Sequence, residues 1–537
     1  DLRFWAEGET PAGFGHELFE DDLERIEENM MRAIERVPAV GEAGIKRVIN
    51  GPMIWSPDSN VLFGPVPELK NYFCCNGVIP GFSQSGGLGL LAAEWIIEGE
   101  TKYDRFAWDL GRFGAWASKE FTKSRVGDQY AHRFSIHFPN EERSAGRPVR
   151  TRPIYQMQKD MGAVMGLNYG WEHPLWFAET PGVKDTNGFT RQNWFEPVGK
   201  ECKMLREKAG IIDISNFAKY VVQGKKGRDW LDAVFANKMP TEVGRSCLTP
   251  LISRRGGLAG DFTVTLIAQD EYWIFGSGMA ERYHKRFFDS VPLPEGVRFD
   301  SRTEAVCGFN LAGPLSRKIL QRLTNTSLNN QDFQFMRSKC ADLAGIDVKM
   351  LRVSFTGDLG WEVHCNTADQ KALYTALLET GKEFGVGPVG SRALMAMRVE
   401  KGYGSWSREY SPEYWPHEQG MDRLCKMDKD FLNKAALQAV LAQEPREQMV
   451  LLHLNEAAVT ASNADATGGE PVFKDGNGVG RVTSGAYGYS VGLSLALAMV
   501  KDVGPGDEVE VMVLGQPHKA KILHQPPFDP TGKKLRA

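Results

Sequence analysis

The chain has 537 residues, of which 42% are hydrophobic and 25% are charged, and its formal net charge is −4. This length predicts about three domains, and the composition is typical of a globular protein. Because the net charge is not positive, we expect no nucleic-acid partner. The longest nearly apolar run, residues 491–500, is too short for a bilayer span of about 20 residues, so we expect no membrane span.

Eight cysteines and ten histidines are scattered along the chain. The sequence contains no C-x-x-C pair and no cysteine–histidine cluster at zinc spacing. We therefore expect no structural metal, and we interpret the cysteines as mostly buried thiols of a reducing compartment.

The first hundred residues predict one α/β unit. Apolar residues at helical spacing indicate an amphipathic helix over residues 17–37, which ends at Pro38. Strands are expected over residues 45–58 and 71–78. Residues 80–99, PGFSQSGGLGLLAAEWIIEG, then predict a glycine-rich loop that leads into an apolar helix.

The rest of the chain divides into three parts. Residues 101–150 are rich in aromatic and charged groups and end in EERSAGRPVRTRP, which predicts an exposed connector. From about 150 to 430 we expect mixed strands and helices, with strands over 219–224, 261–268 and 272–277 and a helix over 368–384. The segment from about 445 to 530 is rich in strands and turns, which predicts a small all-β module.

The glycine-rich stretch does not fit a dinucleotide site. The spacing of Gly81, Gly86, Gly87 and Gly89 differs from G-x-G-x-x-G, and no such fingerprint occurs before it. A pyrophosphate cradle is therefore a poor interpretation. The spacing by itself favours a tight strand–helix turn with close packing.

Three further stretches contain groups that could do chemistry. Asp261 follows a double-glycine turn in SRRGGLAGDFTVT, where it could point into a cavity or be a solvated turn acid. Trp361 and Glu362 in SFTGDLGWEVH could offer a carboxylate beside an aromatic wall, or be part of an ordinary strand. Arg392 and Arg398 share one predicted helix and could bind a carboxylate with two hydrogen bonds each, or form surface ion pairs.

Two regions resemble known families. Residues 50–100 resemble the C-terminal end of the amine-oxidising flavoprotein fold of dimethylglycine and sarcosine dehydrogenases. Residues 153–177, 207–224, 311–320, 430–437 and 480–500 resemble, in order, the folate-binding aminomethyltransferase of the glycine cleavage system. A flavin amine dehydrogenase joined to a folate transferase is the layout of the dimethylglycine and sarcosine dehydrogenases, so the resemblance covers essentially the whole chain.

The resemblance implies an α+β multidomain fold with four parts. Residues 1–105 would be the C-terminal portion of an amine-oxidase-type FAD domain, and residues 106–150 a connecting segment. Residues 151–430 would form an aminomethyltransferase-like folate-binding domain, and residues 431–537 a C-terminal β-barrel.

The resemblance also implies a flavin role for the glycine-rich stretch. The helix start would point at the pyrimidine edge of the flavin ring, where two-electron reduction places negative charge that unpaired N–H groups stabilise. Trp55 would line the amine side of the site, or be core packing. The candidate backbone contacts to FAD are Ser83, Gln84, Ser85, Gly86 and Gly87.

In the transferase part, the resemblance implies that Asp261 is the acid near the folate nitrogens. Glu362, with Trp361 beside it, would hold the pterin. Arg398, or else Arg392, would meet the glutamyl carboxylate of the folate. The chain departs from the family at Asp358, where the family often has Glu, and this weakens a role for that position.

In that family the N-terminal half of the flavin domain carries the Rossmann loop and the covalent flavin attachment. Residues 1–105 cannot bind FAD alone without that first βαβ unit. We therefore expect the chain to be a fragment or a subunit, with a covalently attached FAD held by the missing N-terminal FAD-binding segment or by a separate polypeptide.

The expected function is oxidative N-demethylation of a small methylated amine or amino acid, such as dimethylglycine or sarcosine, by FAD. The one-carbon unit would pass to tetrahydrofolate and give 5,10-methylenetetrahydrofolate, and the electrons would pass to an acceptor. The alternatives are a folate-dependent transferase without flavin chemistry and a non-catalytic regulatory subunit. We expect a bacterial cytoplasmic or mitochondrial matrix location.

Overall fold

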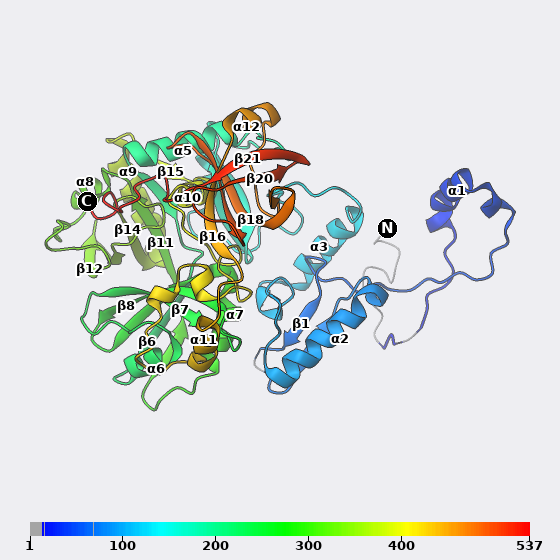
Figure 1. The fold of residues 1–537 in the computed structure, drawn as a ribbon, viewed down its shortest axis with the longest axis horizontal. Helices are drawn as coiled ribbons and strands as arrows, with labels where there is room; N and C mark the ends of the chain where they lie inside the picture. The colour runs from blue at the N-terminus through cyan, green and yellow to red at the C-terminus, as the bar shows by residue number, and fades with distance from the viewer. Residues whose placement is uncertain (1–12, 16, 68) are drawn as a thin grey trace.

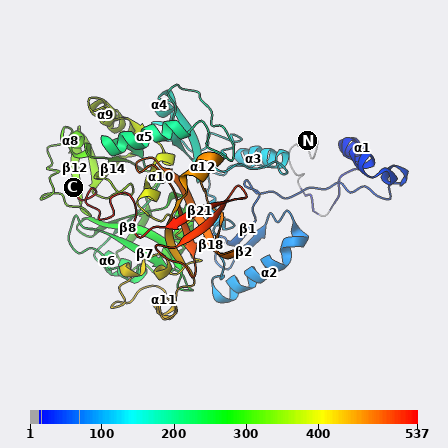
Figure 2. The ribbon, with the colours of Figure 1, turned by 45° about the horizontal axis from the view of Figure 1, so that its top comes forward.

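The computed structural model describes residues 13–15, 17–67 and 69–537. Its N-terminal helix, α1 (Glu27–Arg36), lies away from the other elements (Figures 1 and 2). The predicted helix over 17–37 is confirmed only for its second half, where a 3-10 turn at Glu24–Ile26 leads into α1. No residue of α1 is buried, and Ile34 on its apolar face is half-buried against the 3-10 turn that follows the helix, Pro38–Glu42.

A small antiparallel pair and one long helix follow. Strands β1 (Leu62–Pro65) and β2 (Phe73–Asn76) pair in register and pack against α2 (Gly81–Glu98) through an aromatic cluster of Phe63, Phe73 and Trp95. The strand predicted over residues 71–78 is present as β2, but the prediction of a strand over residues 45–58 is wrong. That stretch contains two prolines, which cannot donate to a ladder, and only one isolated bridge, from Asn50 to Phe19.

The expected glycine-rich loop is also wrong, because α2 already begins at Gly81 and includes the glycines. The stretch runs as one helix from there to Glu98, and Gly99 caps it with a left-handed φ of +78°. The helix buries only Leu88, Leu91 and Trp95.

The segment before residue 153 is not an exposed connector. It contains helix α3 (Lys119–Ala131), and the arginines of its last part are half-buried, or buried in the case of Arg152. Arg147 Nη2 lies 2.6 Å from Glu172 Oε2, and the Glu172 side chain is 1% exposed. Arg152 stacks over the Trp171 ring at 3.7 Å. These contacts attach the segment to the next domain.

Two β-sheets form the centre of the molecule. The five-stranded sheet has the order β10-β6-β9-β8-β7 and the six-stranded sheet the order β12-β13-β14-β11-β5-β15. The five-stranded sheet consists of β6 (Ala218–Gln223), β7 (Ser246–Ile252), β8 (Leu258–Ala268), β9 (Glu271–Gly276) and β10 (Arg298–Ser301). The six-stranded sheet consists of β5 (Gly210–Asp213), β11 (Val306–Ala312), β12 (Ser338–Leu343), β13 (Ile346–Leu351), β14 (Gly360–Asn366) and β15 (Pro388–Val389).

Helices cover these sheets and each sheet has its own apolar core. The strands expected over 219–224, 261–268 and 272–277 are confirmed as β6, β8 and β9, and the helix over 368–384 as α9. The remaining elements of this region are α4 (Tyr155–Asp160), β3 (Ala163–Asn168), β4 (Trp171–Phe177), α5 (Phe195–Glu207), α6 (Gly227–Val234), α7 (Glu281–Asp289), α8 (Ser316–Gln321), α9 (Gln370–Lys382), α10 (Ser391–Glu400) and α11 (Lys434–Leu441).

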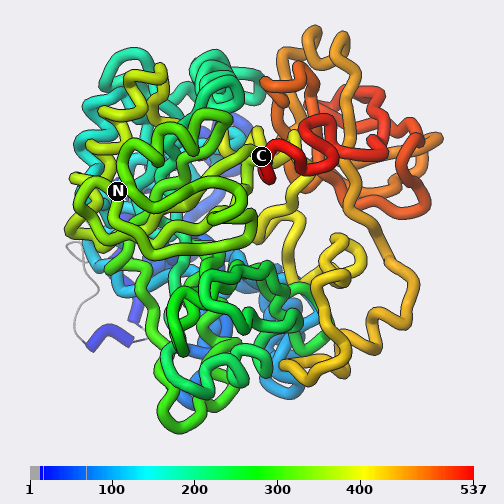
Figure 3. Tube along the Cα trace, turned by 90° about the vertical axis from the view of Figure 1, so that its left-hand side faces the viewer, coloured from blue at the N-terminus to red at the C-terminus, as the bar shows by residue number. Residues whose placement is uncertain are grey.

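The C-terminal part is a closed barrel, as expected, in the order β16-β19-β18-β17-β20-β21. Small and branched apolar side chains fill it, and β16 pairs with β21 to complete the closure. Figure 3 shows the barrel, drawn orange to red, as a lobe beside the two sheets. Its elements are β16 (Gln448–Leu454), α12 (Glu456–Ser462), β17 (Pro471–Lys474), β18 (Asn477–Gly488), β19 (Leu493–Val500), β20 (Glu508–Val513) and β21 (Gln516–Ile522).

Within the described ranges, no helix combines the length and the apolar character that crossing a membrane requires. The same residues contain no group of three or more His, Cys, Asp or Glu side chains placed to hold a metal ion.

Candidate functional site

The start of α2 offers fewer free N–H groups than expected. The backbone N–H groups of Ser83 and Gln84 both donate to the Pro80 carbonyl, at 3.1 Å. Those of Ser85, Gly86 and Gly87 lie inside the helix, where each is used by the carbonyl one turn earlier. The expectation that these five residues offer free backbone N–H groups to the flavin is therefore corrected. The unpaired donors of the first turn belong instead to Gly81 and Phe82.

A pocket of about 510 Å³ opens at this helix start. Trp55 and Gln84, which the sequence assigned to the amine side and the flavin side, both line it. Trp108, Phe134 and His137 line it too. The structure thus brings Trp55, predicted for the amine side, and Gln84, predicted for the flavin side, to one cavity beside the positive end of a helix.

Asp261 lies inside β8 and not at its first position, because the strand begins at Leu258. The expected tight turn before it is present: Gly256 has a φ of +81°, and Ser253 Oγ accepts the N–H of Gly257 at 3.1 Å. Asp261 is half-buried, and desolvation raises the pKa of its carboxyl to about 6. At neutral pH this group is a carboxylate that takes up a proton more readily than an ordinary aspartate.

Strand register decides which way Asp261 faces. Thr263 lies directly opposite Phe275 of β9, and Phe275 lies opposite Lys219 of β6. Because side chains alternate along a strand, Asp261 shares the face of Thr263, Phe275 and Lys219. Phe262 points to the other side, into the core of the five-stranded sheet.

Glu362 faces the same space from the six-stranded sheet. It is half-buried on β14, and its Oε2 lies 3.3 Å from His364 Nε2. The His364 ring stacks on Phe275 with centroids 4.6 Å apart. Asp261 and Glu362 therefore lie on the faces that the two sheets turn toward each other, although no hydrogen bond joins them among the described residues.

A buried lysine completes this intersheet cluster. The Lys219 side chain is fully buried, and its Nζ donates to the carbonyls of Ser215 at 3.0 Å and Phe217 at 2.8 Å. Burial and then the nearby Arg152 lower the pKa of Lys219 to about 7. Burial likewise lowers the pKa of His364, so its ring is neutral at pH 7.

Trp361 is not an aromatic wall beside Glu362, which corrects the expectation. It is fully buried in the core of the six-stranded sheet, since it points to the opposite face of β14. Asp358 is buried as well and is bound by Arg206. A turn precedes the strand, with a φ of +87° at Gly357.

Both candidate arginines are already used inside the protein. Arg398 is fully buried and donates to Glu409 at 2.8 Å, to Ser484 at 2.6 Å and to the Tyr403 carbonyl at 2.9 Å. Arg392 forms two hydrogen bonds with Asp185, at 2.9 and 2.5 Å. The structure thus contradicts the expectation that either guanidinium is free to meet a ligand carboxylate.

Sequence reasoning missed Lys219, Phe275, His364 and Tyr410. His364 was detectable, because it follows Glu362 by two residues on one strand. Burial, and then the charge of Asp261, raise the pKa of Tyr410 above its ordinary value. The loop carrying Tyr410 packs on the turn before β8, where the Leu258 N–H donates to the Tyr414 carbonyl at 3.0 Å.

Three family models match the chain in sequence order. The FAD dependent oxidoreductase central domain matches residues 98–151, and the GCVT N-terminal domain matches residues 154–429. The glycine cleavage T-protein C-terminal barrel domain matches residues 448–529. The first of these matches covers the segment that the sequence had suggested was a connector.

Curated relatives match almost the whole chain. Mitochondrial dimethylglycine dehydrogenase of Mus musculus is 34% identical over 97% of this chain and 60% of the relative. Mitochondrial sarcosine dehydrogenase of Mus musculus is 28% identical over 99% of this chain and 63% of the relative. The chain thus spans a little over three fifths of the length of these relatives.

One solved structure shares the fold of the larger part. It is glycine cleavage system aminomethyltransferase T from Bartonella henselae, with a TM-score of 0.61 and 21% identity over 71% of this chain and 98% of that chain. The GCVT match, which covers about half of the chain, establishes that the chain belongs to the GCVT family, and its homologues include the dimethylglycine and sarcosine dehydrogenases.

Proposed function

We propose that this chain takes part in oxidative N-demethylation of a small methylated amino acid, with dimethylglycine or sarcosine as the leading substrates. The one-carbon unit would pass to tetrahydrofolate and give 5,10-methylenetetrahydrofolate. The observation that carries the folate half is that Asp261 and Glu362 face one intersheet space from β8 and β14. The location we propose is the mitochondrial matrix or a bacterial cytoplasm.

The residues present fit one side of a flavin site. The pocket at the start of α2 is lined by the aromatic side chain of Trp55 and by Pro80 and Gln84, and the N–H groups of Gly81 and Phe82 belong to the helix turn that lies between these two residues. FAD, when bound, would supply the two-electron oxidation of the amine. In the proposed assembly Trp55 packs against the amine, and the helix end favours negative charge beside it. The dinucleotide and any covalent attachment would be held by a further segment or subunit.

In the second half-reaction we assign the chemistry to the intersheet cluster. Glu362 would accept the N–H donors of the pterin edge, and His364 would hold that carboxylate in place. Asp261 would stabilise the cationic iminium or accept the proton released when the folate nitrogen attacks it. Enclosure between the sheets would matter because water would otherwise release the one-carbon unit as formaldehyde.

Asp261→Asn in the assembled flavin- and folate-loaded protein tests this assignment. Amine-dependent flavin reduction should keep its rate, while free formaldehyde should rise because folate captures less of the one-carbon unit. Asp270→Asn, in the turn between β8 and β9, is the matched control and should leave the yield unchanged. An unchanged formaldehyde yield in Asp261→Asn, with folate present, would refute the role.

A folate-dependent transferase without flavin chemistry is the second candidate. It is favoured by the loss of the expected backbone contacts at Ser85, Gly86 and Gly87. Visible flavin absorbance in the natively purified assembly, bleached by dimethylglycine or sarcosine, would decide against it.

Folate binding without any turnover would instead support the regulatory-subunit alternative. An intact mass of the native assembly would identify the missing FAD-binding polypeptide, and bleaching that requires a second protein would reveal an electron acceptor.

A further inference from the structure

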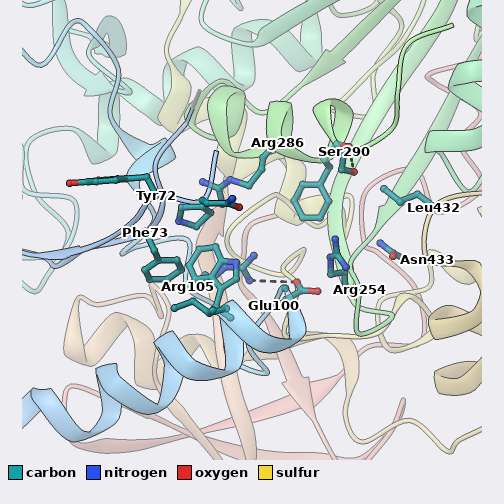
Figure 4. Close-up of a pocket in the computed structure, with 15 residues that line it drawn as sticks. Tyr72, Phe73, Glu100, Arg105, Arg254, Arg286, Ser290, Leu432 and Asn433 are labelled. Carbon is teal, nitrogen blue, oxygen red and sulfur yellow. Dashed lines mark hydrogen bonds and ion pairs between the residues drawn. The ribbon is translucent and has the colours of Figure 1, made fainter. Parts of the chain in front are cut away.

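A second pocket, of about 610 Å³, lies where α2 and β2 meet α7 and the β7–β8 turn. Figure 4 shows side chains from these separate elements converging on it. Phe287, which lines this pocket, packs against the buried side chains of Tyr283 and Trp406. None of the residues of the intersheet cluster lines this pocket, and it shares no lining residue with the cavity around Trp55.

One part of the pocket carries an exposed arginine, Arg254, and a buried carboxylate, Glu100, that is incompletely hydrogen-bonded. Glu100 is 2% exposed, and its Oε1 lies 3.5 Å from Arg105 Nη1, while its Oε2 has no hydrogen-bond partner. Arg254 forms no hydrogen bond or ion pair with any other residue that the structure describes. It packs against Gly99, the residue just before Glu100. A buried carboxylate oxygen without a donor is costly unless something else supplies one.

The other walls combine aromatic side chains with the polar side chains of Asn71, Ser290 and Asn433. Phe73 and Trp95 meet edge to face with centroids 5.5 Å apart, and Phe287 lines the pocket from α7. The remaining cations are already compensated. Arg286 donates to both oxygens of Asp109, at 2.7 Å each, and Arg105 lies over the Trp95 ring at 4.0 Å.

We propose that this pocket binds a free amino acid with a large apolar side chain. The carboxylate of the ligand pairs with Arg254, its ammonium donates to Glu100 Oε2, and its side chain packs on Phe73, Trp95 and Phe287. An anion-binding and a cation-binding group next to each other match the two charges of an α-amino acid. The volume falls in the usual range for small-molecule sites, about 300–1,000 Å³. The inference does not depend on the proposed demethylation.

Calorimetric titration of the chain with four compounds tests the proposal. L-Phenylalanine carries both charges and a ring, whereas phenylacetate lacks the ammonium, phenethylamine lacks the carboxylate and glycine lacks the ring. L-Phenylalanine should bind, and each of the other three should bind about tenfold or more weakly, since each loses one class of contact. No heat from L-phenylalanine, or equal affinity of any one of the other three, overturns the proposal.

Substitutions on the β7–β8 turn locate the site. Arg254→Gln should weaken L-phenylalanine binding about tenfold or more, and Arg254→Lys should restore part of the loss because it keeps the charge. Arg255→Gln is the matched control, since Arg255 is the next residue, pairs with Glu98 on the surface and does not line the pocket. Equal affinity in Arg254→Gln and Arg255→Gln, with unchanged unfolding temperatures, contradicts the assignment to this pocket.

Discussion

Arg398 Nη1 lies 2.8 Å from Glu409 Oε2, and both side chains are fully buried. Glu409 Oε1 also accepts from Thr483 at 2.8 Å and from Ser484 at 2.5 Å on β18. This pair ties helix α10 and the loop that carries Tyr410 to the barrel. An arginine that the sequence suggested for ligand binding therefore joins two domains.

Glu409→Gln should destabilise the protein by about 3–5 kcal/mol, because it leaves the buried Arg398 charge without a counterion. Urea unfolding followed by far-UV circular dichroism measures the loss. Lys434→Gln is the control, since Lys434 pairs with the fully exposed Asp430 one turn away and should cost about 0.5 kcal/mol or less. Similar losses of unfolding free energy in the two variants would show that the buried ion pair stabilises the protein no more than the exposed one.

Lys219 should make stability depend on pH. Its folded pKa of about 7 lies below the ordinary value of 10.5, so the unfolded state binds more protons between these values. The free energy of unfolding of the wild type should therefore rise relative to Lys219→Met as pH increases from 7 toward 10. The rise should approach about 1.4 kcal/mol per pH unit at most.

Unfolding measured at pH 6, 8 and 9 tests this dependence. Lys226→Met, at an exposed position just before α6, is the control and should follow the wild type at every pH. If the difference in the free energy of unfolding between the wild type and Lys219→Met stays constant across this pH range, Lys219 keeps its proton in the folded protein.

Gly357→Ala should reduce the stability of the protein more than Gly345→Ala. Both glycines have a left-handed φ, +87° and +81°, so both substitutions should lose about 1–2 kcal/mol from backbone strain. At Gly357 a Cβ would also lie 2.8 Å from the Cδ of Lys401, whereas at Gly345 it would meet nothing within 4 Å. Thermal unfolding of both variants gives the comparison, and equal costs would mean that the Lys401 side chain moves aside freely.

Glu362→Gln should weaken tetrahydrofolate binding by about tenfold or more with little effect on stability, because a neutral amide loses a charge-assisted hydrogen bond. Trp361→Phe should do the reverse. It removes volume from a closed core and should cost about 1–3 kcal/mol of stability while leaving folate affinity unchanged. Calorimetric folate titration and urea unfolding of both variants distinguish the two faces of β14. A loss of folate affinity only in Trp361→Phe would place the folate site on the Trp361 face of the strand.

The local pattern of apolar residues was sufficient to predict many helices and strands of this protein. Alternation and helical spacing predicted β6, β8, β9, α9 and the barrel, since these elements bury side chains at a regular period. The same reasoning failed over residues 45–58, where an apolar stretch has no partner strand, and at Gly81, where the glycines belong to a helix.

The sequence by itself determined which residue types could carry the chemistry: the acids Asp261 and Glu362, and a helix start at residues 80–87. Only the tertiary structure decided which of them face a common space. Strand register turns Asp261 and Glu362 toward the gap between two sheets and turns Trp361 away from it. Packing against distant segments occupies Arg392 with Asp185 and Arg398 with Glu409. The physical reason is that such pairings join residues far apart in the chain, which local spacing does not encode.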